Sequence, residues 1–250
     1  MRAAFSTIGH CAFTLWHCLG VPPDNTSHAE KLISGLGAAI GILIVYGALC
    51  FYSPDHALVL LMASVAASSV LVFAVPHGAL SQPWPTIGSY LVSGFIGVSC
   101  QQWIDSSALS AVVAVGLSVS AMHYLRCLHP PGGAVALIAV TGGPDIQALG
   151  YGFVVAPALI NAATLVCAGI VYNCLFPWRR YPVHMLYLKP HKHPLVRKHD
   201  LIELGYDDYQ YALKKQDSFI DINPEDLAEL VECAREHALM TQGISQAELK

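Results

Sequence analysis

The stretch His129–Gly133 reads His-Pro-Pro-Gly-Gly and precedes a short apolar run, Ala134–Val140. Two prolines begin a helix easily but cannot continue one, and two glycines leave the backbone open to close approach. A helix that starts in this way presents unpaired N–H groups and the positive end of its dipole. The stretch therefore predicts a short helix whose N-terminus is suited to a small anion.

The composition around this stretch is that of a membrane protein. The chain has 250 residues, of which 54% are hydrophobic and 12% are charged, whereas soluble domains have about 25% charged residues. Between Leu32 and Leu125 the only charged residues are Asp55 and Asp105, and most of the others follow Pro177. This segregation favours a membrane domain with a polar tail over a large soluble all-α protein.

The apolar segments predict an all-α polytopic transmembrane bundle of about six spans, because a spanning helix needs about 20 apolar residues. The predicted spans are Ile33–Phe51, Ala57–Val75, Thr86–Trp103, Ser107–Leu125, Pro130–Thr141 and Gln147–Phe176, the last interrupted by Pro157.

Basic residues predict the orientation of these spans. Lys31, Arg126 and the basic run after Pro177, which includes Arg179, are expected on the cytoplasmic side. They share a side only if Pro130–Thr141 crosses the bilayer, which gives six crossings and two cytoplasmic termini. The alternative is a re-entrant Pro130–Thr141 with five crossings.

The second and fifth spans both begin with small residues and lead into a loop rich in proline or glycine. Three spans in each half would place the halves in opposite orientations, as in transporters built from inverted repeats that meet at broken helices. The sequence thus suggests an inverted repeat of three plus three spans. Chance similarity between runs of small residues is the alternative.

The chain divides into three predicted regions. Residues 1–30 form an N-terminal interfacial segment, residues 31–182 the transmembrane domain, and residues 183–250 a cytoplasmic tail with an amphipathic helix over 224–240. No CxxC pair occurs and the cysteines are scattered, so we predict neither a metal site nor a cofactor. Without a basic stripe, no nucleic-acid partner is expected either.

The segment Leu128–Ala134 resembles the signature of the HPP family of integral membrane proteins. The upstream stretch Val70–Pro76 and the Gln82-Pro83-Trp84 segment are also similar to that family, as are Asn161 and the exit Arg179–Pro182. The resemblance covers residues 30–182 and implies a transporter of nitrite. The chain departs from the family pattern at Ala66, where a glycine is expected, and at Tyr90, where a more polar residue is usual. It also lacks the nucleotide-binding CBS pair that some relatives carry.

Backbone N–H groups and hydroxyls at the starts of the second and fifth spans are the expected donors to the anion, with Gln82 added by the resemblance. The predicted site residues are His129, Pro130, Pro131, Gly132, Gly133, Ala134, Ser64, Ala67, Ser68, Ser69, Gln82 and Asn161. The alternative for the small residues is close helix packing. His129 either carries a proton beside the anion or caps the break as a neutral ring.

The sequence as a whole predicts a transporter or channel for a small inorganic anion, with nitrite implied by the resemblance. The expected partners are that anion and the lipid bilayer. The sequence does not decide whether the protein forms a homo-oligomer, because Gly37 and Gly41 suit either packing within the bundle or dimerisation. The bacterial plasma membrane is the expected location. We predict no enzyme activity. The alternatives are a scaffold or sensor acting through the C-terminal helix, and, less favoured, an intramembrane enzyme.

Overall fold

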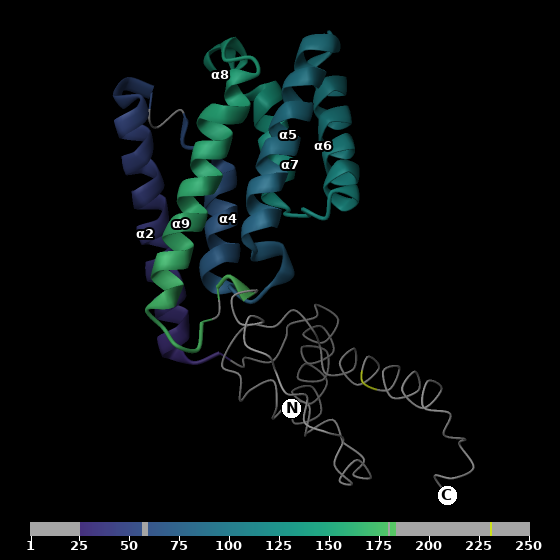
Figure 1. Cartoon of the computed structure of the whole chain (residues 1–250). Coiled ribbons are helices and arrows are strands. Elements are labelled where there is room, and N and C mark those ends of the chain that lie inside the picture. The colour runs from purple at the N-terminus through teal and green to yellow at the C-terminus, as the bar shows by residue number, and fades with distance from the viewer. Residues whose placement is uncertain (1–25, 57–59, 180, 184–230, 232–250) are drawn as a thin grey trace, which may run out of the picture. The chain divides into compact units, whose positions relative to one another are not determined.

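The computed structural model describes residues 26–56, 60–179, 181–183 and 231, and within these ranges the secondary structure is helical (Figure 1). In chain order the elements are α2 (His28–Tyr52), η1 (Pro54–His56), α4 (Ala63–Ala74), η2 (Ala79–Ser81), α5 (Pro83–Trp103), α6 (Ser107–Tyr124), α7 (Pro131–Thr141), α8 (Pro144–Ala148), η3 (Val154–Leu159) and α9 (Ile160–Cys174). The predicted all-α membrane bundle is confirmed. The predicted amphipathic helix of the tail lies outside the described residues.

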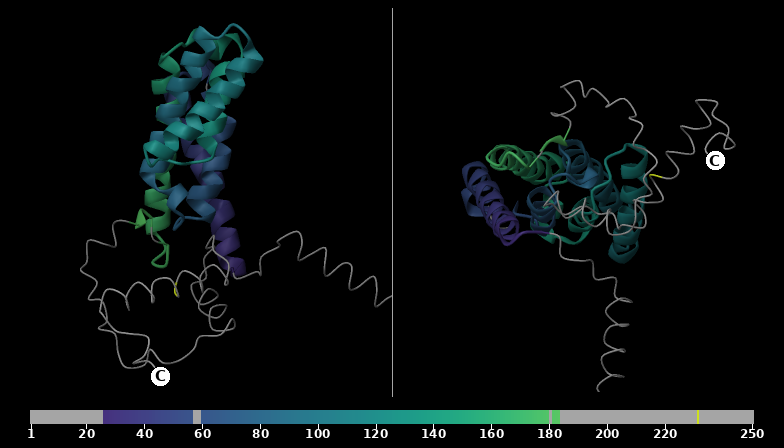
Figure 2. Two further views of the ribbon diagram at one scale, coloured as in Figure 1. Left: turned by 90° about the vertical axis from the view of Figure 1, so that its right-hand side faces the viewer. Right: turned by 90° about the horizontal axis from the view of Figure 1, so that it is seen from below.

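The helices pack as two groups that contact each other. The view from below in Figure 2 shows α2 (purple) and α9 (green), two members of one group, side by side. In one group α2 packs on α4 and α9, and α4 also contacts α9. In the other α6 packs on α7 and α5, and α5 packs on α7. Exchanging α2 with α6, α4 with α7 and α9 with α5 reproduces the same set of contacts. The inverted repeat suggested by the sequence stays a prediction, because three mutually contacting helices in each group do not fix the relative orientation of the groups.

Within the described part of the chain, three helices are long and apolar enough to cross a membrane, namely α2, α6 and the kinked stretch Val154–Cys174. By contrast, α4 has 12 residues and α7 has 11. At 1.5 Å per residue these two helices measure about 16–18 Å, roughly half of the 30 Å hydrocarbon core. The bundle therefore contains one half-length helix in each of its two groups.

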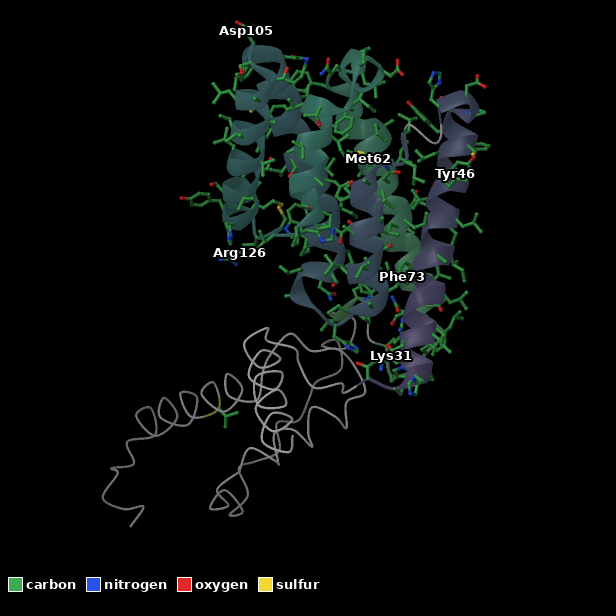
Figure 3. The ribbon with its side chains drawn as sticks, turned by 180° about the vertical axis from the view of Figure 1, so that it is seen from behind. Lys31, Tyr46, Met62, Phe73, Asp105 and Arg126 are labelled. Carbon is green, nitrogen blue, oxygen red and sulfur yellow. The ribbon has the colours of Figure 1, made fainter. Side chains whose placement is uncertain are left out.

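The predicted continuous helix over Ala57–Val75 is wrong at Leu61 and Met62, which are not helical, and residues 57–59 lie outside the described part of the chain. Helix α4 begins only at Ala63, after Met62 in an extended conformation (φ −73°, ψ 142°). The Leu60 carbonyl accepts a hydrogen bond of 2.9 Å from the Asn161 side chain rather than from a helical N–H group. A contact with a distant helix thus replaces the hydrogen bond that would start α4 earlier. Figure 3 shows Met62 at an intermediate level, between Asp105 near one end of the bundle and Lys31 near the other.

Proline sets several other helix boundaries. The predicted interruption at Pro157 is confirmed, because η3 is a π-helical stretch with Ala156 out of helical geometry (φ −134°, ψ 114°). Helix α5 begins at Pro83 instead of the predicted Thr86, since prolines fit the first turn, where N–H groups need no helical partner. The predicted start of the last span at Gln147 is also wrong, because Gln147 belongs to the short helix α8, which a turn containing Gly150 (φ 50°) separates from η3.

Glycines allow the close packing of α2 within its group. A Cβ atom at Gly37 would lie 2.6 Å from Cε1 of Tyr172 and 2.7 Å from Cδ1 of Phe73. A Cβ atom at Gly41 would also overlap the Phe73 ring. These two glycines therefore serve packing inside the bundle, which was one of the two interpretations of their spacing.

Candidate functional site

A buried chain of hydrogen bonds connects α4, α5 and the segment that leads into α7. Ser68 Oγ lies 2.9 Å from the Tyr90 hydroxyl and 2.7 Å from His129 Nε2. On the other side of the ring, His129 Nδ1 lies 2.8 Å from the Leu80 carbonyl oxygen. Ser68, Tyr90 and His129 each have 0% of their surface exposed. We call this arrangement the His129 chain.

The direction of the His129 chain follows from what each group is able to donate. A carbonyl oxygen only accepts, so the Leu80 carbonyl requires a proton on His129 Nδ1. In the neutral ring Nε2 then carries a lone pair and accepts from the Ser68 hydroxyl. The Ser68 oxygen in turn accepts from the Tyr90 hydroxyl. A neutral His129 therefore satisfies every member of the chain.

Ser64 adds an unpaired hydroxyl to this cluster. It lies one helical turn before Ser68 on α4 and within reach of the same Tyr90 phenol, and only 1% of its surface is exposed. Its Oγ atom has no hydrogen-bond partner. Because a buried polar atom is usually satisfied, this hydroxyl is suited to a guest that accepts hydrogen bonds.

The other predicted positions on α4 differ from Ser64 and Ser68. Ala67 is exposed, so it lies on a different face of the helix from the two buried serines. Ser69 is buried, but its hydroxyl donates to the Ala66 carbonyl of its own helix at 2.7 Å. These two residues are therefore separate from the His129 chain.

At the start of α7 the predicted backbone donors already have partners. The N–H group of Gly132 donates to the His129 carbonyl at 2.8 Å, and that of Gly133 donates to the Pro130 carbonyl at 3.0 Å. Pro131 and Gly132 are buried, Gly133 and Ala134 are half-buried, and Pro130 is exposed. This part of the predicted site consequently shapes the backbone that carries His129.

Gly132 is also a position of close approach. A Cβ atom there would lie 2.8 Å from Cβ of Ser89 and 3.0 Å from Sδ of Met122. At Gly133 the nearest atom would be Cγ1 of Val115, at 3.9 Å. The first glycine therefore brings α7 against α5 and α6, whereas the second leaves room for a side chain.

Gln82 and Asn161 hold the connecting segments in place. Gln82 donates to the carbonyls of Pro76 and Gly78, at 3.0 and 2.9 Å, and accepts from the N–H group of Val183. Asn161 donates to Leu60, and its Oδ1 atom is buried without a partner. The hydrogen bonds of both amides thus fix the segments that flank α4.

Tyr90 is a member of the cluster that the sequence analysis missed as a site residue. It occurs on α5 among buried small polar residues, namely Thr86, Ser89 and Ser93. Spacings of three and four residues place such side chains on one helix face. This hydroxyl-rich stripe was the signal that could have pointed to Tyr90. No local pattern indicated that its hydrogen-bond partner is Ser68, which lies 22 residues away on α4.

A second polar cluster lies where the carboxyl end of α4 meets the beginning of α2, near the end of the bundle that Figure 3 marks with Lys31. Arg179 Nη2 and Glu30 Oε1 form an ion pair of 2.6 Å, and both residues have 4% of their surface exposed. Nη1 of the same guanidinium donates to the Phe73 carbonyl, at 3.0 Å, and to Asn173 Oδ1, at 3.1 Å. Arg179 therefore differs from a solvated basic residue, because its side chain is buried in an ion pair.

Acidic, cysteine and histidine side chains of the described residues do not gather in groups of three that would suit a metal ion. The polar cluster around His129 consists of hydroxyls, one imidazole and a backbone carbonyl. Such a set is able to donate hydrogen bonds to a small acceptor.

Comparison with known proteins agrees with this architecture. The profile of the HPP transmembrane region matches residues 23–182. Two transmembrane proteins of Dictyostelium discoideum are 31% and 33% identical to the chain over 156 and 155 residues. These matches cover 60% of this chain in both cases and 49% and 53% of the relatives, so the chain spans about half the length of the curated relatives it matches. No solved structure matches the chain.

The family match covers more than half of the chain and includes both half-length helices and the segment that carries His129. The chain therefore belongs to the HPP transmembrane family and is an integral membrane protein.

Proposed function

We propose that this protein transports a small inorganic anion, with nitrite as the substrate that the family resemblance favours. The observation that carries the proposal is the buried cluster of Ser64, Ser68, Tyr90 and His129. Its unpaired Ser64 hydroxyl lies in the first turn of the half-length helix α4. Nitrite accepts hydrogen bonds and carries one negative charge, so hydroxyl donors near a helix N-terminus suit it.

The distribution of charge supports a transport site rather than a tight binding site. Between Leu32 and Trp178 the only lysine or arginine is Arg126, which is exposed. A buried cation in the spans would be costly and would hold an anion firmly. Neutral hydroxyls and helix dipoles provide a weaker attraction from which the anion is able to leave.

Closure of the cluster favours a carrier over an open channel. The side chains of Ser68, Tyr90 and His129 are inaccessible to solvent, so the site is occluded from both sides in this conformation. The two half-length helices, α4 and α7, belong to different groups of the bundle. Rocking of one group against the other is a common way for such proteins to expose a central site alternately to each side.

The orientation that fits this proposal has six crossings and two cytoplasmic termini. Helix α6 has 18 residues, which at 1.5 Å per residue is about 27 Å. If Asp105 lies at one surface of the bilayer, this length brings Arg126 close to the opposite surface. The bacterial plasma membrane remains the proposed location.

Flux measurements in proteoliposomes test the proposal against its alternatives. Purified full-length protein is reconstituted, and uptake of nitrite, nitrate, chloride and formate is compared at pH 7.5, with protein-free liposomes correcting for leakage of nitrous acid. We expect protein-dependent nitrite uptake that saturates. A chain shortened by residues 200–250 should retain this flux. Absence of flux for all four anions would exclude transport and favour the scaffold or sensor alternative.

A further inference from the structure

The geometry points to the His129 chain as a switch that binds one proton together with one anion, by reversing the direction of its hydrogen bonds. This inference rests on the proposed function, because it assigns a coupling ion to the same site. It also assigns Tyr90 as a direct donor to the anion. The step involves three side chains that already lie in hydrogen-bond contact.

In the neutral state the donors of the chain are occupied. Tyr90 donates to Ser68, Ser68 donates to His129 Nε2, and His129 Nδ1 donates to the Leu80 carbonyl. The Leu80 carbonyl fixes the proton on Nδ1, so an incoming proton has only Nε2 as its acceptor on the ring. The phenol proton of Tyr90 is unavailable to a guest in this state.

Protonation of Nε2 reverses the chain. The new N–H group donates to the Ser68 oxygen, the Ser68 hydroxyl turns to donate to the Tyr90 oxygen, and the Tyr90 hydroxyl turns away from Ser68. Only one covalent bond forms, between Nε2 and the incoming proton, and none breaks within the protein. The Tyr90 hydroxyl and the unpaired Ser64 hydroxyl are then two free donors near the start of α4.

Burial makes the proton and the anion dependent on each other. His129 is fully buried, and an isolated charge at such a position is strongly disfavoured. A monovalent anion beside the imidazolium makes the site neutral again. Conversely, an anion that enters without a proton meets a Tyr90 hydroxyl already used by Ser68. The expected stoichiometry is therefore one proton for each anion.

Few other groups lie close enough to His129 to bind the incoming proton in its place. The polar groups that contact its ring are Ser68 from α4, Tyr90 from α5 and the Leu80 carbonyl from the α4–α5 connection. Tyr90 is the titratable member of this set, and it acts here as a neutral donor.

Two further titratable residues lie close to His129 along the chain. Arg126, at the end of α6, is exposed. Cys127 is buried, and its side chain lies against Gly88 of α5, where a Cβ atom would be 2.9 Å from Cβ of the cysteine. Neither residue therefore replaces the imidazole as the proton acceptor of the chain.

Calorimetric titration of nitrite into the purified full-length protein measures the coupling directly. Titrations at pH 7 in buffers with different ionisation enthalpies give the number of protons taken up for each anion bound. We expect a value close to one for the wild type and close to zero for His129→Gln. A wild type that binds nitrite without proton uptake would overturn the switch while leaving anion transport intact. A wild type that binds and transports no anion would overturn the proposed function itself.

Three variants test the chain itself. Ser68→Ala disconnects the imidazole from the phenol, so proton uptake should fall below half a proton per anion. Tyr90→Phe leaves Ser68 as the end of the chain, so it should retain proton uptake but bind nitrite at least tenfold more weakly. Ser69→Ala is the matched control and should behave as the wild type, because the Ser69 hydroxyl bonds to its own helix. Full proton uptake in Ser68→Ala, or unchanged affinity in Tyr90→Phe, would overturn the assignment.

Discussion

Glu30 and Arg179 form a buried ion pair that joins the first turn of α2 to the segment after α9. The same guanidinium donates to the Phe73 carbonyl at the end of α4. A cation near a helix C-terminus satisfies free carbonyls and complements the helix dipole. The pair therefore connects the ends of all three helices in one group of the bundle.

Removing one partner of this pair should destabilise the protein. Arg179→Met removes the guanidinium from the buried Glu30 carboxylate and from the Phe73 carbonyl, and breaking a buried ion pair typically costs about 3–5 kcal/mol. Thermal unfolding in detergent should show a clear drop in midpoint, and Arg126→Gln, at an exposed cation, serves as the control. An unchanged midpoint in Arg179→Met would show that the pair contributes nothing to stability.

Adjacent glycines at the start of α7 should respond differently to the same substitution. Gly132→Ala places a methyl group 2.8 Å from Cβ of Ser89, so helix α7 must shift, at a typical cost of about 1–3 kcal/mol. Gly133→Ala meets no atom closer than 3.9 Å and should keep both stability and flux. The two variants are compared by thermal unfolding and by nitrite uptake. Equal behaviour would contradict the close packing of α7 on α5.

Cysteine labelling should distinguish six crossings from a re-entrant segment. With a membrane-impermeant thiol reagent, we expect Asp105→Cys and Asp145→Cys to react from outside the cell and Arg126→Cys to react from the cytoplasmic side. A background without native cysteines is needed for this experiment. Reaction of Asp145→Cys from the cytoplasmic side alone would indicate a re-entrant segment, and reaction of Arg126→Cys from outside would contradict the six-crossing orientation.

Local sequence signals were sufficient for many helix boundaries. Pro76, Pro131 and Pro157 mark a helix end, a helix start and an interruption, because proline acts on its own turn of backbone. The start of α4 at Ala63 was not predictable in this way. It depends on the Asn161 side chain, which reaches the Leu60 carbonyl from 101 residues further along the chain.

The same distinction applies to the candidate site. His129 and Ser68 were suggested by local composition, and the structure brings them together across 61 residues of sequence. Tyr90 was taken only as a departure from the family pattern, since an aromatic residue in an apolar span gives no signal of its hydroxyl partner. The role of Arg179 was missed for the same reason, because its partner Glu30 lies 149 residues away.

Nitrite uptake by the double variant Ser64→Ala, Ser68→Ala tests the central claim most directly. Both substitutions keep small helix-forming residues, and one removes a buried hydroxyl that has no partner, so the fold should persist. In proteoliposomes at pH 7.5, with equal amounts of folded protein, we predict at least a tenfold loss of uptake relative to the wild type and no loss in Ser69→Ala. Wild-type uptake by the double variant would contradict the claim that the anion binds at this cluster.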